Sequence, residues 1–298
     1  MKILLYVFLF TGIMSCTKVP VEKEQTPQTT KDYTYLNLNN EFKSYWFDGT
    51  AELTSYQLTQ MRYGEPRKGH AVLIFVKEPF LKAQQVKANI PSKASVDVLK
   101  LNYTKTFNTG IYPYSIMQSV FSPLTEQPHA IKVTASTQEW CGQTYMQLNN
   151  REDFEVRSHS YFEGEADQEL NLEKSFLENE LWTKLRINPN GISTGELNVL
   201  PDFSYLRLKH KPIEHYKATL SQEVKQETLV TTLGYSELDR TLVIFQENTF
   251  PYQILKWQEK VGKDQPVTEA VLDKTMKIDY WNKNATKFEF LRDSLNLN

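Results

Sequence analysis

Cysteine is scarce in this chain of 298 residues, and so are glycine and long apolar runs. Cys16 and Cys141 are too few for a disulfide framework, so a folded body has to be held together by a packed core. No uninterrupted apolar run reaches the roughly 18 residues that a membrane-spanning helix needs. The 34 lysines and arginines nearly balance the 36 aspartates and glutamates, which argues against a basic nucleic-acid-binding surface.

Signatures of enzymes that use metals or nucleotides are also missing. The five histidines are scattered, and none has the H-E-x-x-H spacing of a zinc protease. The glycine patterns that cradle nucleotide phosphates are absent. These absences favour binding over catalysis, and we expect no cofactor and no nucleic-acid partner. Aromatic residues, in contrast, make up 12% of the chain, which suits strands more than helices.

The first sixteen residues, MKILLYVFLFTGIMSC, have the layout of a secretory signal. Lys2 precedes an apolar run, Ile3–Phe10, that is too short to span a bilayer as a stable helix. The stretch Ile13-Met-Ser-Cys16 resembles the lipobox of bacterial lipoproteins, in which the cysteine is acylated and becomes the first residue. We therefore predict a signal peptide over residues 1–15 and a palmitate-type anchor on Cys16, with an ordinary secretory signal as the alternative.

Residues 16–40 contain little that can pack. The segment TKVPVEKEQTPQTTKDYTYLNLNN is rich in Thr, Gln, Lys, Glu and Pro, a composition typical of a flexible tether. We expect the folded body to be a single β-rich domain over residues 41–298. Thr17 stands where an aspartate can retain lipoproteins in some inner membranes, so we expect the cell outer membrane and leave the leaflet open.

Most of the body alternates apolar and polar residues with period two, the pattern of strands buried on one face. Ala51–Tyr63, the turn cluster Gly64–Gly69 and His70–Val76 together predict a hairpin. We expect a strongly curved antiparallel sheet, either a partly open barrel or a sandwich. Lys82–Asp97 and Asn108–Gln127 are expected to be long loops. Further strands are expected at Val98–Phe107, Ala130–Leu148, Phe154–Phe162, Leu197–Leu200, Ser204–His210, His215–Val224, Thr228–Tyr235, Thr241–Gln246, Tyr252–Val261 and Thr275–Tyr280.

One segment, Asn171–Arg186, predicts an amphipathic helix near residues 171–186. Asn171 can cap its start, and the turn residues Asn188–Gly191 can stop it. We expect its apolar side to pack on the sheet, with a partner-binding or membrane-facing helix as the alternative. The apolar residues at helical spacing are Leu172, Phe176, Leu177, Leu181 and Leu185.

The stretch TQEWCGQTY holds Cys141 beside a tryptophan. If Leu148 faces Phe154 across a turn, Cys141 and His159 are diagonal neighbours on one face of the sheet, at about 7–8 Å. A thiol enzyme with these two residues is therefore the alternative reading. We favour a buried Cys141 that only fills space, because free cysteine is among the most buried residue types.

The acidic run HSYFEGEAD, residues 159–167, offers one further candidate site. Carboxylates at alternate strand positions point to one side and can hold a divalent cation. We favour a solvated turn over a metal site, because glycine in an acidic run is ordinary turn composition. The candidate ligands are His159, Glu163, Glu165 and Asp167.

Two other groups of side chains are candidates for binding. The cationic residues Arg62, Arg67, Lys68 and His70 surround the first expected turn, where a phosphate contact is the alternative to a solvated tip. Aromatic residues are expected to line a cavity or rim of the curved sheet. They are Trp46, Tyr112, Tyr114, Trp140 and Trp182.

Several stretches resemble a family of envelope lipoproteins from Bacteroidetes-type bacteria that often carries the label "septum formation inhibitor Maf". They include SYWFDGTAELTSYQL, RYGEPRKGHAVLIFV and STQEWCGQTY, and the resemblance covers nearly the whole mature chain. The Ser-x-Ser-Pro-Arg-Arg motif of Maf nucleotide pyrophosphatases is absent. Its nearest fragment is Ser122-Pro-Leu124. The resemblance therefore implies an envelope lipoprotein and transfers no catalytic residue.

Together these observations predict an outer-membrane lipoprotein that binds an apolar or lipid-like ligand or an envelope partner. Two alternatives stay open. One is a periplasmic thiol enzyme or hydrolase that uses Cys141 and His159, and the other is a structural subunit of an envelope complex. The half-barrels of lipoprotein carriers, which hold acyl chains, provide a resemblance at the level of architecture.

Overall fold

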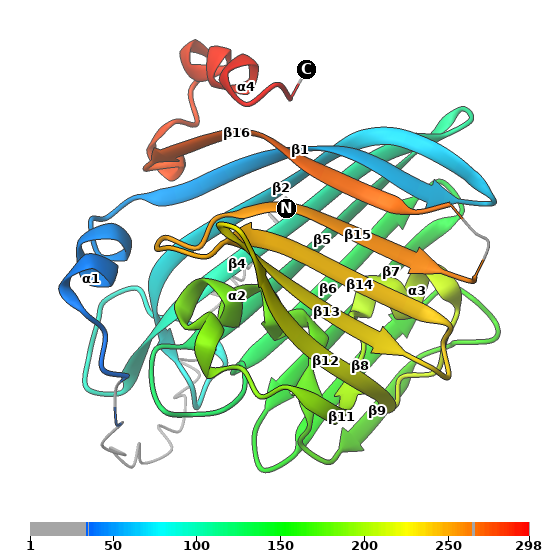
Figure 1. Ribbon diagram of the computed structural model, residues 1–298, viewed down its shortest axis with the longest axis horizontal. Coiled ribbons are helices and arrows are strands. Elements are labelled where there is room, and N and C mark those ends of the chain that lie inside the picture. The colour runs from blue at the N-terminus through cyan, green and yellow to red at the C-terminus, as the bar shows by residue number, and fades with distance from the viewer. Residues whose placement is uncertain (1–33, 35, 264–265, 298) are drawn as a thin grey trace, which may run out of the picture.

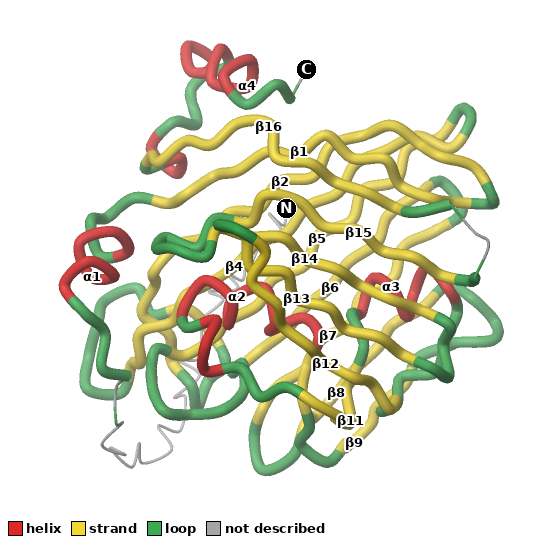
Figure 2. Tube along the Cα trace, viewed as in Figure 1, coloured by secondary structure: helices red, strands yellow, loops and turns green. Residues whose placement is uncertain are grey.

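The computed structural model describes residue 34 and residues 36–263 and 266–297. The predicted signal peptide, the predicted anchor at Cys16 and most of the predicted tether lie outside the described residues. The body is mainly β, as predicted (Figures 1 and 2). Its helices are α1 (Asn40–Trp46), α2 (Glu178–Ile187), α3 (Phe203–Lys209), α4 (Phe290–Ser294) and the short 3-10 helices η1 (Pro189–Gly191), η2 (Tyr280–Asn282) and η3 (Thr286–Phe288).

The strands form one large sheet that stays open. Neighbouring strands pair antiparallel except β10 and β11, which pair in parallel. The order across the sheet is β10-β11-β12-β13-β14-β15-β16-β1-β2-β4-β5-β6-β7-β8-β9, and β3 pairs with β2. The strands are β1 (Ala51–Arg62), β2 (Glu65–Leu81), β3 (Val86–Lys87), β4 (Ser95–Thr109), β5 (Tyr112–Pro123), β6 (Lys132–Glu139), β7 (Gly142–Asn150), β8 (Phe154–Ser160), β9 (Gln168–Leu172), β10 (Phe176–Leu177), β11 (Gly195–Leu200), β12 (Tyr216–Lys225), β13 (Thr228–Tyr235), β14 (Arg240–Glu247), β15 (Ile254–Val261) and β16 (Thr268–Ile278).

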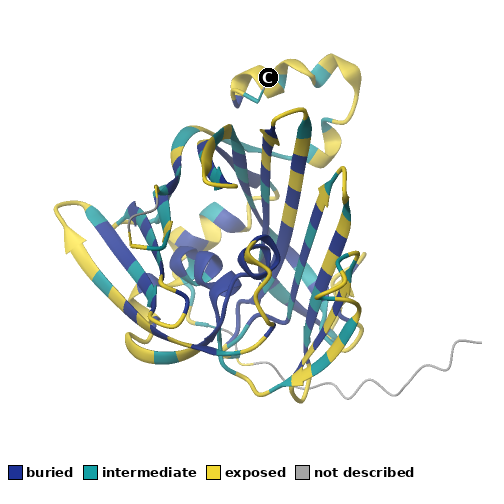
Figure 3. Ribbon diagram, turned by 90° about the vertical axis from the view of Figure 1, so that its right-hand side faces the viewer, coloured by how far each residue is buried: buried dark blue, intermediate teal, exposed yellow. Residues whose placement is uncertain are grey.

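The sheet curves around α2 and α3, which lie between its two wings (Figure 3). One wing is the run of strands from β10 to β16, and the other is the run from β1 to β9. Trp182 of α2 shows how the helices join the wings: its ring centroid is 5.3 Å from that of Tyr103 in β4 and 5.2 Å from that of Trp257 in β15. Nearly all of α2 and α3 is buried as a result. Apolar side chains of both wings and both helices thus form one core, which stabilises the open sheet by removing apolar surface from water.

The predicted helix at 171–186 begins later than expected. Residues 168–172 form β9, which pairs with β8, and α2 starts at Glu178. Leu172 and Phe176 are four residues apart, a spacing that fits a helix of period 3.6 as well as a strand of period two. Asn171 therefore lies in a strand rather than at the start of a helix. At the actual start of α2, the backbone N–H of Leu177 donates to the Glu180 carboxylate at 3.5 Å.

The predicted strand Ser204–His210 is in fact helix α3. Asp202 caps it by accepting a hydrogen bond from the Tyr205 backbone N–H at 3.0 Å, and His210 ends it in the left-handed conformation. Residues 203–208 are all buried inside the curve of the sheet. A helix that is buried all round has no polar stripe, so its sequence lacks the amphipathic signal from which helices are predicted.

Two predicted boundaries near the middle of the chain were also wrong. The expected loop Asn108–Gln127 forms the end of β4, the turn between β4 and β5, and all of β5. The expected strand Ala130–Leu148 is two strands, β6 and β7, joined at Trp140 and Cys141. Both turns have two central residues, so only a short interruption marks them in the sequence. The first predicted hairpin is confirmed, since β1 pairs with β2 from Arg62 and Glu65 onward, but the expected turn cluster Gly64–Gly69 lies mostly in β2.

Candidate binding sites

Four turns gather at one end of the sheet. Because β1 to β9 pair antiparallel and mostly in chain order, every second turn lies at the same end. We call this end, formed by the β1–β2, β4–β5, β6–β7 and β8–β9 turns, the hairpin end. The described chain starts at the opposite end of the sheet. There the backbone N–H of Glu126, in the β5–β6 connection, donates to the Thr34 carbonyl at 3.0 Å. In Figure 1, α1 lies on the left and the β1–β2 turn on the right.

Each of these turns exposes one large apolar side chain. Ile111 is 85% exposed, and Trp140 and Tyr161 are each 68% exposed. Tyr63, in the β1–β2 turn, is 61% exposed. Single exposed apolar residues are common on protein surfaces, but a group on adjacent turns indicates a binding surface.

Rings at the hairpin end form a continuous row, which we call the aromatic row: Tyr63, Tyr114, Tyr112 and Trp140. The Tyr63 and Tyr114 hydroxyls are 3.0 Å apart. Ring centroids of Tyr112 lie 6.0 Å from Tyr114 and 6.3 Å from Trp140. Arg62 supports the row because its guanidinium donates to both Tyr63 and Tyr114 at 3.2 Å. The row is therefore held by contacts at one edge and open to solvent at the other.

Three of the five predicted lining residues belong to this row, namely Tyr112, Tyr114 and Trp140. Trp182 instead lies in the core, between the two wings. Trp46 packs near the opposite end, 6.0 Å from Phe75. The five residues thus do not share one cavity.

The expectation of a buried Cys141 is wrong, because its thiol is exposed. Trp140 and Cys141 are the two turn residues between Glu139 and Gly142. The Cys141 N–H donates to the Glu139 carboxylate at 2.8 Å. A side-chain hydrogen bond between the thiol and the Glu139 carboxylate, together with the negative charge of Glu139, raises the pKa of the thiol, which makes it a weaker nucleophile at neutral pH.

The predicted register that brought Cys141 towards His159 is also wrong. Asn150 faces Phe154, so that His159 lies opposite Tyr145. The imidazole Nδ1 of His159 is 3.3 Å from the Asp167 carboxylate. Cys141 and His159 therefore each have a carboxylate neighbour of their own, and neither is placed as the other's partner.

The acidic run at 159–167 is tied into the fold by its carboxylates. Glu165 accepts from the Ser160 hydroxyl and lies 2.6 Å from His210 Nδ1. The guanidinium of Arg207 lies over Phe162 at 3.9 Å. Across the described part of the chain, no three His, Cys, Asp or Glu side chains are grouped as metal ligands. Glu165 thus joins the β8–β9 turn to the end of α3.

One motif-like stretch adds no catalytic site. Gly191-Ile-Ser193-Thr-Gly195 has the spacing of a nucleophile elbow. That motif needs a serine between a strand and a following helix, whereas Ser193 follows η1 and precedes β11. The order of helix and strand around Ser193 is therefore the reverse of the strand-then-helix order that the motif requires.

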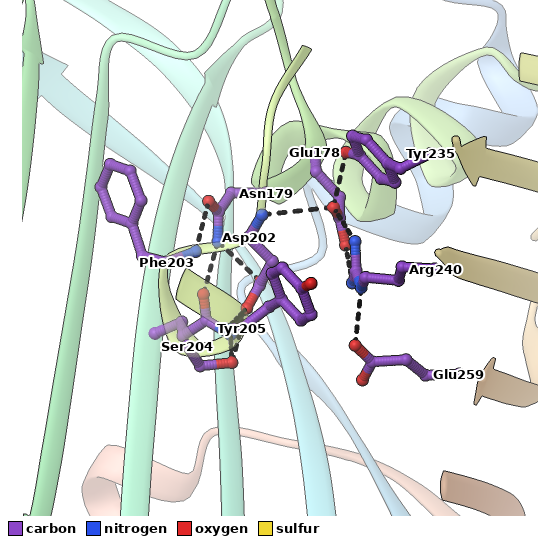
Figure 4. A network of polar contacts seen from close by, with 10 residues as sticks. Glu178, Asn179, Asp202, Phe203, Ser204, Tyr205, Tyr235, Arg240 and Glu259 are labelled. Atoms are coloured by element: carbon purple, nitrogen blue, oxygen red, sulfur yellow. Dashed lines mark hydrogen bonds and ion pairs between the residues drawn. The ribbon is translucent and has the colours of Figure 1, made fainter. Parts of the chain in front are cut away.

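A buried polar network surrounds the first turn of α2 (Figure 4). Glu178 receives two hydrogen bonds of 2.6 Å from Arg240 and one of 2.7 Å from the Tyr235 hydroxyl. Arg240 also donates to Glu259 at 2.7 Å. Burial works against the charge of Arg240, but Glu178 and Glu259 hold the pKa of its guanidinium well above the ordinary value. This ion-pair network joins α2 to β14 and β15.

The next residue of α2 extends the network to the other wing. The amide of Asn179 donates to Asp202 at 2.9 Å and to Gln118 of β5. Gln118 in turn donates to the Ser204 hydroxyl at 3.1 Å. Polar side chains from α2, α3 and both wings are therefore connected, and they fix where α3 lies.

A pocket of about 220 Å³ opens beside this network. It lies at the hairpin end, between the end of β1, α3 and the connection from β15 to β16. Cationic side chains outnumber anionic ones among its lining residues by three to one. The lining residues are Gln60, Met61, Arg62, Tyr63, Gly64, Lys105, Ser204, Tyr205, Leu208, Lys209, Glu259, Val261, Pro266 and Thr268.

Comparisons with protein-family models, curated proteins and solved structures give no match. Within the described residues, no helix combines the length and the apolar character needed to cross a membrane.

Proposed function

We propose that this chain is a lipid-anchored protein of the outer membrane that binds another envelope protein through its hairpin end. The anchor follows from the signal and lipobox pattern that ends at Cys16. The binding surface is formed by Tyr63, Tyr112 and Trp140 of the aromatic row together with the exposed Ile111 and Tyr161, while the buried Tyr114 supports the row from below. The observation that carries the proposal is the exposure of a large apolar side chain at each of four adjacent turns.

The chemistry of this surface is that of a protein interface. Tryptophan and tyrosine are enriched among the residues that contribute most to protein–protein binding. Their rings supply large contact areas at a low cost in side-chain entropy. At the hairpin end they stand on short turns of a single sheet, so little ordering is needed before a partner binds.

The position of the tether supports a protein partner over the bilayer that holds the anchor. The 17 residues between Cys16 and Thr34 span at most about 61 Å when fully extended. Strand β2, with 17 residues, is about 58 Å long. Since Thr34 lies at the opposite end, the tether would have to run back along almost the whole body to bring the hairpin end to that membrane.

The filled interior supports a partner over an apolar ligand held inside the sheet. An acyl chain would need the space on the concave face that α2, α3 and rings such as Trp182 and Trp257 occupy. The thiol-enzyme alternative has less support as well, because Glu139 raises the pKa of Cys141 and His159 pairs with Asp167.

A photo-crosslinking amino acid at Ile111 tests the proposal in intact cells. We expect a discrete adduct with one envelope protein, and loss of that adduct when Trp140→Ser and Tyr63→Ser are combined. The same amino acid at Tyr145, which is exposed on the outer face of β7, is the matched control and should give no such adduct. Lipid adducts alone at Ile111, or equal adducts at both positions, would refute a protein partner.

A further inference from the structure

Two buried donors of residues that line the pocket at the hairpin end, the Tyr205 hydroxyl and the Arg62 Nε, have no acceptor. Lys105 is 7% exposed and Tyr205 is 4% exposed, and both line the pocket. The Tyr205 hydroxyl is buried without a hydrogen-bond partner. The Lys105 ammonium lies 4.9 Å from the ring centroid of Tyr103, and its charge helps to lower the pKa of the Glu259 carboxyl. Buried polar groups are normally satisfied, so unpaired donors around a cavity indicate a missing acceptor.

Two acceptors face the same pocket. The side-chain amide nitrogen of Gln60 donates a hydrogen bond to the Thr268 hydroxyl at 3.2 Å. The Oε1 of the same side chain is buried without a partner. Glu259 accepts from Arg240 through Oε1 only, and its Oε2 receives no hydrogen bond from the described residues. The pocket therefore offers donors on one side and acceptors on the other.

We propose that this pocket binds a small molecule with a single carboxylate group that also carries a hydroxyl or ammonium group. The carboxylate accepts from the Lys105 ammonium and the Tyr205 hydroxyl. The hydroxyl or ammonium donates to Gln60 Oε1 and Glu259 Oε2. The site is separate from the aromatic row, although Tyr63 contributes to both.

Charge decides between a carboxylate and a phosphate. Arg62 donates to the Leu208 carbonyl and to two tyrosine hydroxyls, and its Nε is buried without a partner, so the repulsion that separates the two ligands comes from Glu259. Burial opposes the charge of Glu259, but Arg240 and Lys105 hold its pKa below the ordinary value, so it is ionised at neutral pH. A dianion would be repelled by that carboxylate, whereas a molecule with a single carboxylate and a donor group satisfies it.

Size and protonation fit the same ligand class. The volume of about 220 Å³ is smaller than the roughly 300–1,000 Å³ of pockets for drug-sized molecules, which limits the ligand to a few heavy atoms or to the end of a longer molecule. Burial raises the pKa of Tyr205 to about 12, so its hydroxyl keeps the proton that it donates.

Calorimetric titration of the full mature chain with glycine, glycolate, acetate and inorganic phosphate at constant ionic strength tests the proposal. We expect saturable binding of glycine or glycolate, weaker binding of acetate, and none of phosphate. Lys105→Met and Tyr205→Phe should each weaken binding about tenfold, the usual effect of losing one charged or buried hydrogen bond. A tripeptide with a free C-terminus, compared with its amidated form, separates a peptide source of the carboxylate from a free small molecule.

Lys260→Met is the matched control, because Lys260 is exposed on the strand that carries Glu259. It should bind as the unchanged protein does. Thermal unfolding of each variant checks that it is folded. Absence of binding to all the carboxylates, tighter binding of phosphate, or unchanged affinity in folded Lys105→Met would each overturn the proposal.

Discussion

At the scale of single residues, two buried ion pairs hold α2 inside the sheet. Glu178 and Arg240 fix its first turn, and Arg186 fixes its last turn by donating to the Glu52 carboxylate of β1 at 2.6 and 2.7 Å. Arg186 also lies over the ring of Phe75, 4.7 Å from the centroid. Neither pair could be predicted from the sequence, because each joins residues more than sixty positions apart and charge alone does not identify a partner.

Arg186→Met should therefore destabilise the fold strongly. It leaves the Glu52 carboxylate buried without its cation, a change that typically costs about 3–5 kcal/mol. Urea unfolding followed by tryptophan fluorescence measures the loss. Lys184→Met, in the same helix turn with a more exposed side chain, is the control and should cost far less. A loss below about 1 kcal/mol for Arg186→Met would contradict the role assigned to the pair.

The same pair predicts how stability depends on pH. Burial opposes the ionisation of Glu52, but Arg186 and the Tyr45 hydroxyl lower its pKa below the ordinary value. A lowered carboxyl pKa contributes stability that is fully present above the unfolded value, about 4.3 for glutamate, and is lost as the pH falls through the folded value. The free energy of unfolding should therefore drop below about pH 4.

In Arg186→Met the loss of unfolding free energy at acidic pH should become smaller or reverse. An unpaired buried carboxyl has a raised pKa, so protonation of Glu52 would stabilise the folded variant. Urea unfolding across the acidic range, compared between the two proteins, measures the slopes. Equal slopes would show that Glu52 does not contribute to the acid sensitivity.

Cys141 gives a second prediction at this scale. Since its thiol is exposed, iodoacetamide should modify it completely in the folded protein without lowering the melting temperature. Glu139→Gln should speed the reaction, because the Glu139 carboxylate raises the pKa of the thiol. A requirement for denaturant before modification would contradict the turn position of Cys141.

At the scale of elements, the sequence predicted most strands but misplaced both buried helices. Period-two alternation was sufficient for β14 and for the second half of β1, where buried residues alternate with more exposed ones. It failed for α3, which is buried on all sides. Turns of two residues, such as Trp140–Cys141, were missed because they hardly interrupt the alternation.

Strand β2 contains a close approach that a glycine makes possible. A Cβ on Gly69 would lie 2.1 Å from the Thr106 carbonyl oxygen of β4, and the backbone there cannot move without breaking the pairing. Gly69→Ala should thus destabilise the protein by about 1–3 kcal/mol or more, as overpacking does. Gly234→Ala in β13 meets nothing within 4 Å and should be neutral or up to about 1 kcal/mol stabilising. Urea unfolding distinguishes them, and equal effects would refute the close contact.

At the scale of the whole molecule, period and composition predicted a mainly β body but not how the sheet is filled. The curve of the sheet and its open edge depend on α2 and α3 lying between the wings, which no local pattern encodes. The aromatic residues at the hairpin end could be named from the sequence, but their grouping could not. It arises because alternate turns of an antiparallel sheet share one end.

The proposed anchor predicts where the whole chain is found. Cys16→Ser should move the protein from the membrane fraction to the soluble periplasmic fraction, since each buried methylene of the acyl chains contributes about 0.8 kcal/mol to attachment. Incorporation of labelled palmitate into the unchanged chain, and its absence from the variant, measures acylation directly. Membrane association that persists without the cysteine would contradict the anchor.

The central claim is that a protein partner covers the hairpin end in the envelope, and the native Cys141 reports on it. The measurement is the rate at which a soluble maleimide modifies Cys141 in isolated membranes, relative to the purified protein. We predict a rate that is several-fold slower in membranes and is restored by combining Ile111→Ser with Trp140→Ser. A cysteine placed by Tyr145→Cys, on the outer face of β7, in a Cys141→Ser background should react equally in both settings. Equal rates for Cys141 in membranes and in the purified protein would contradict the account.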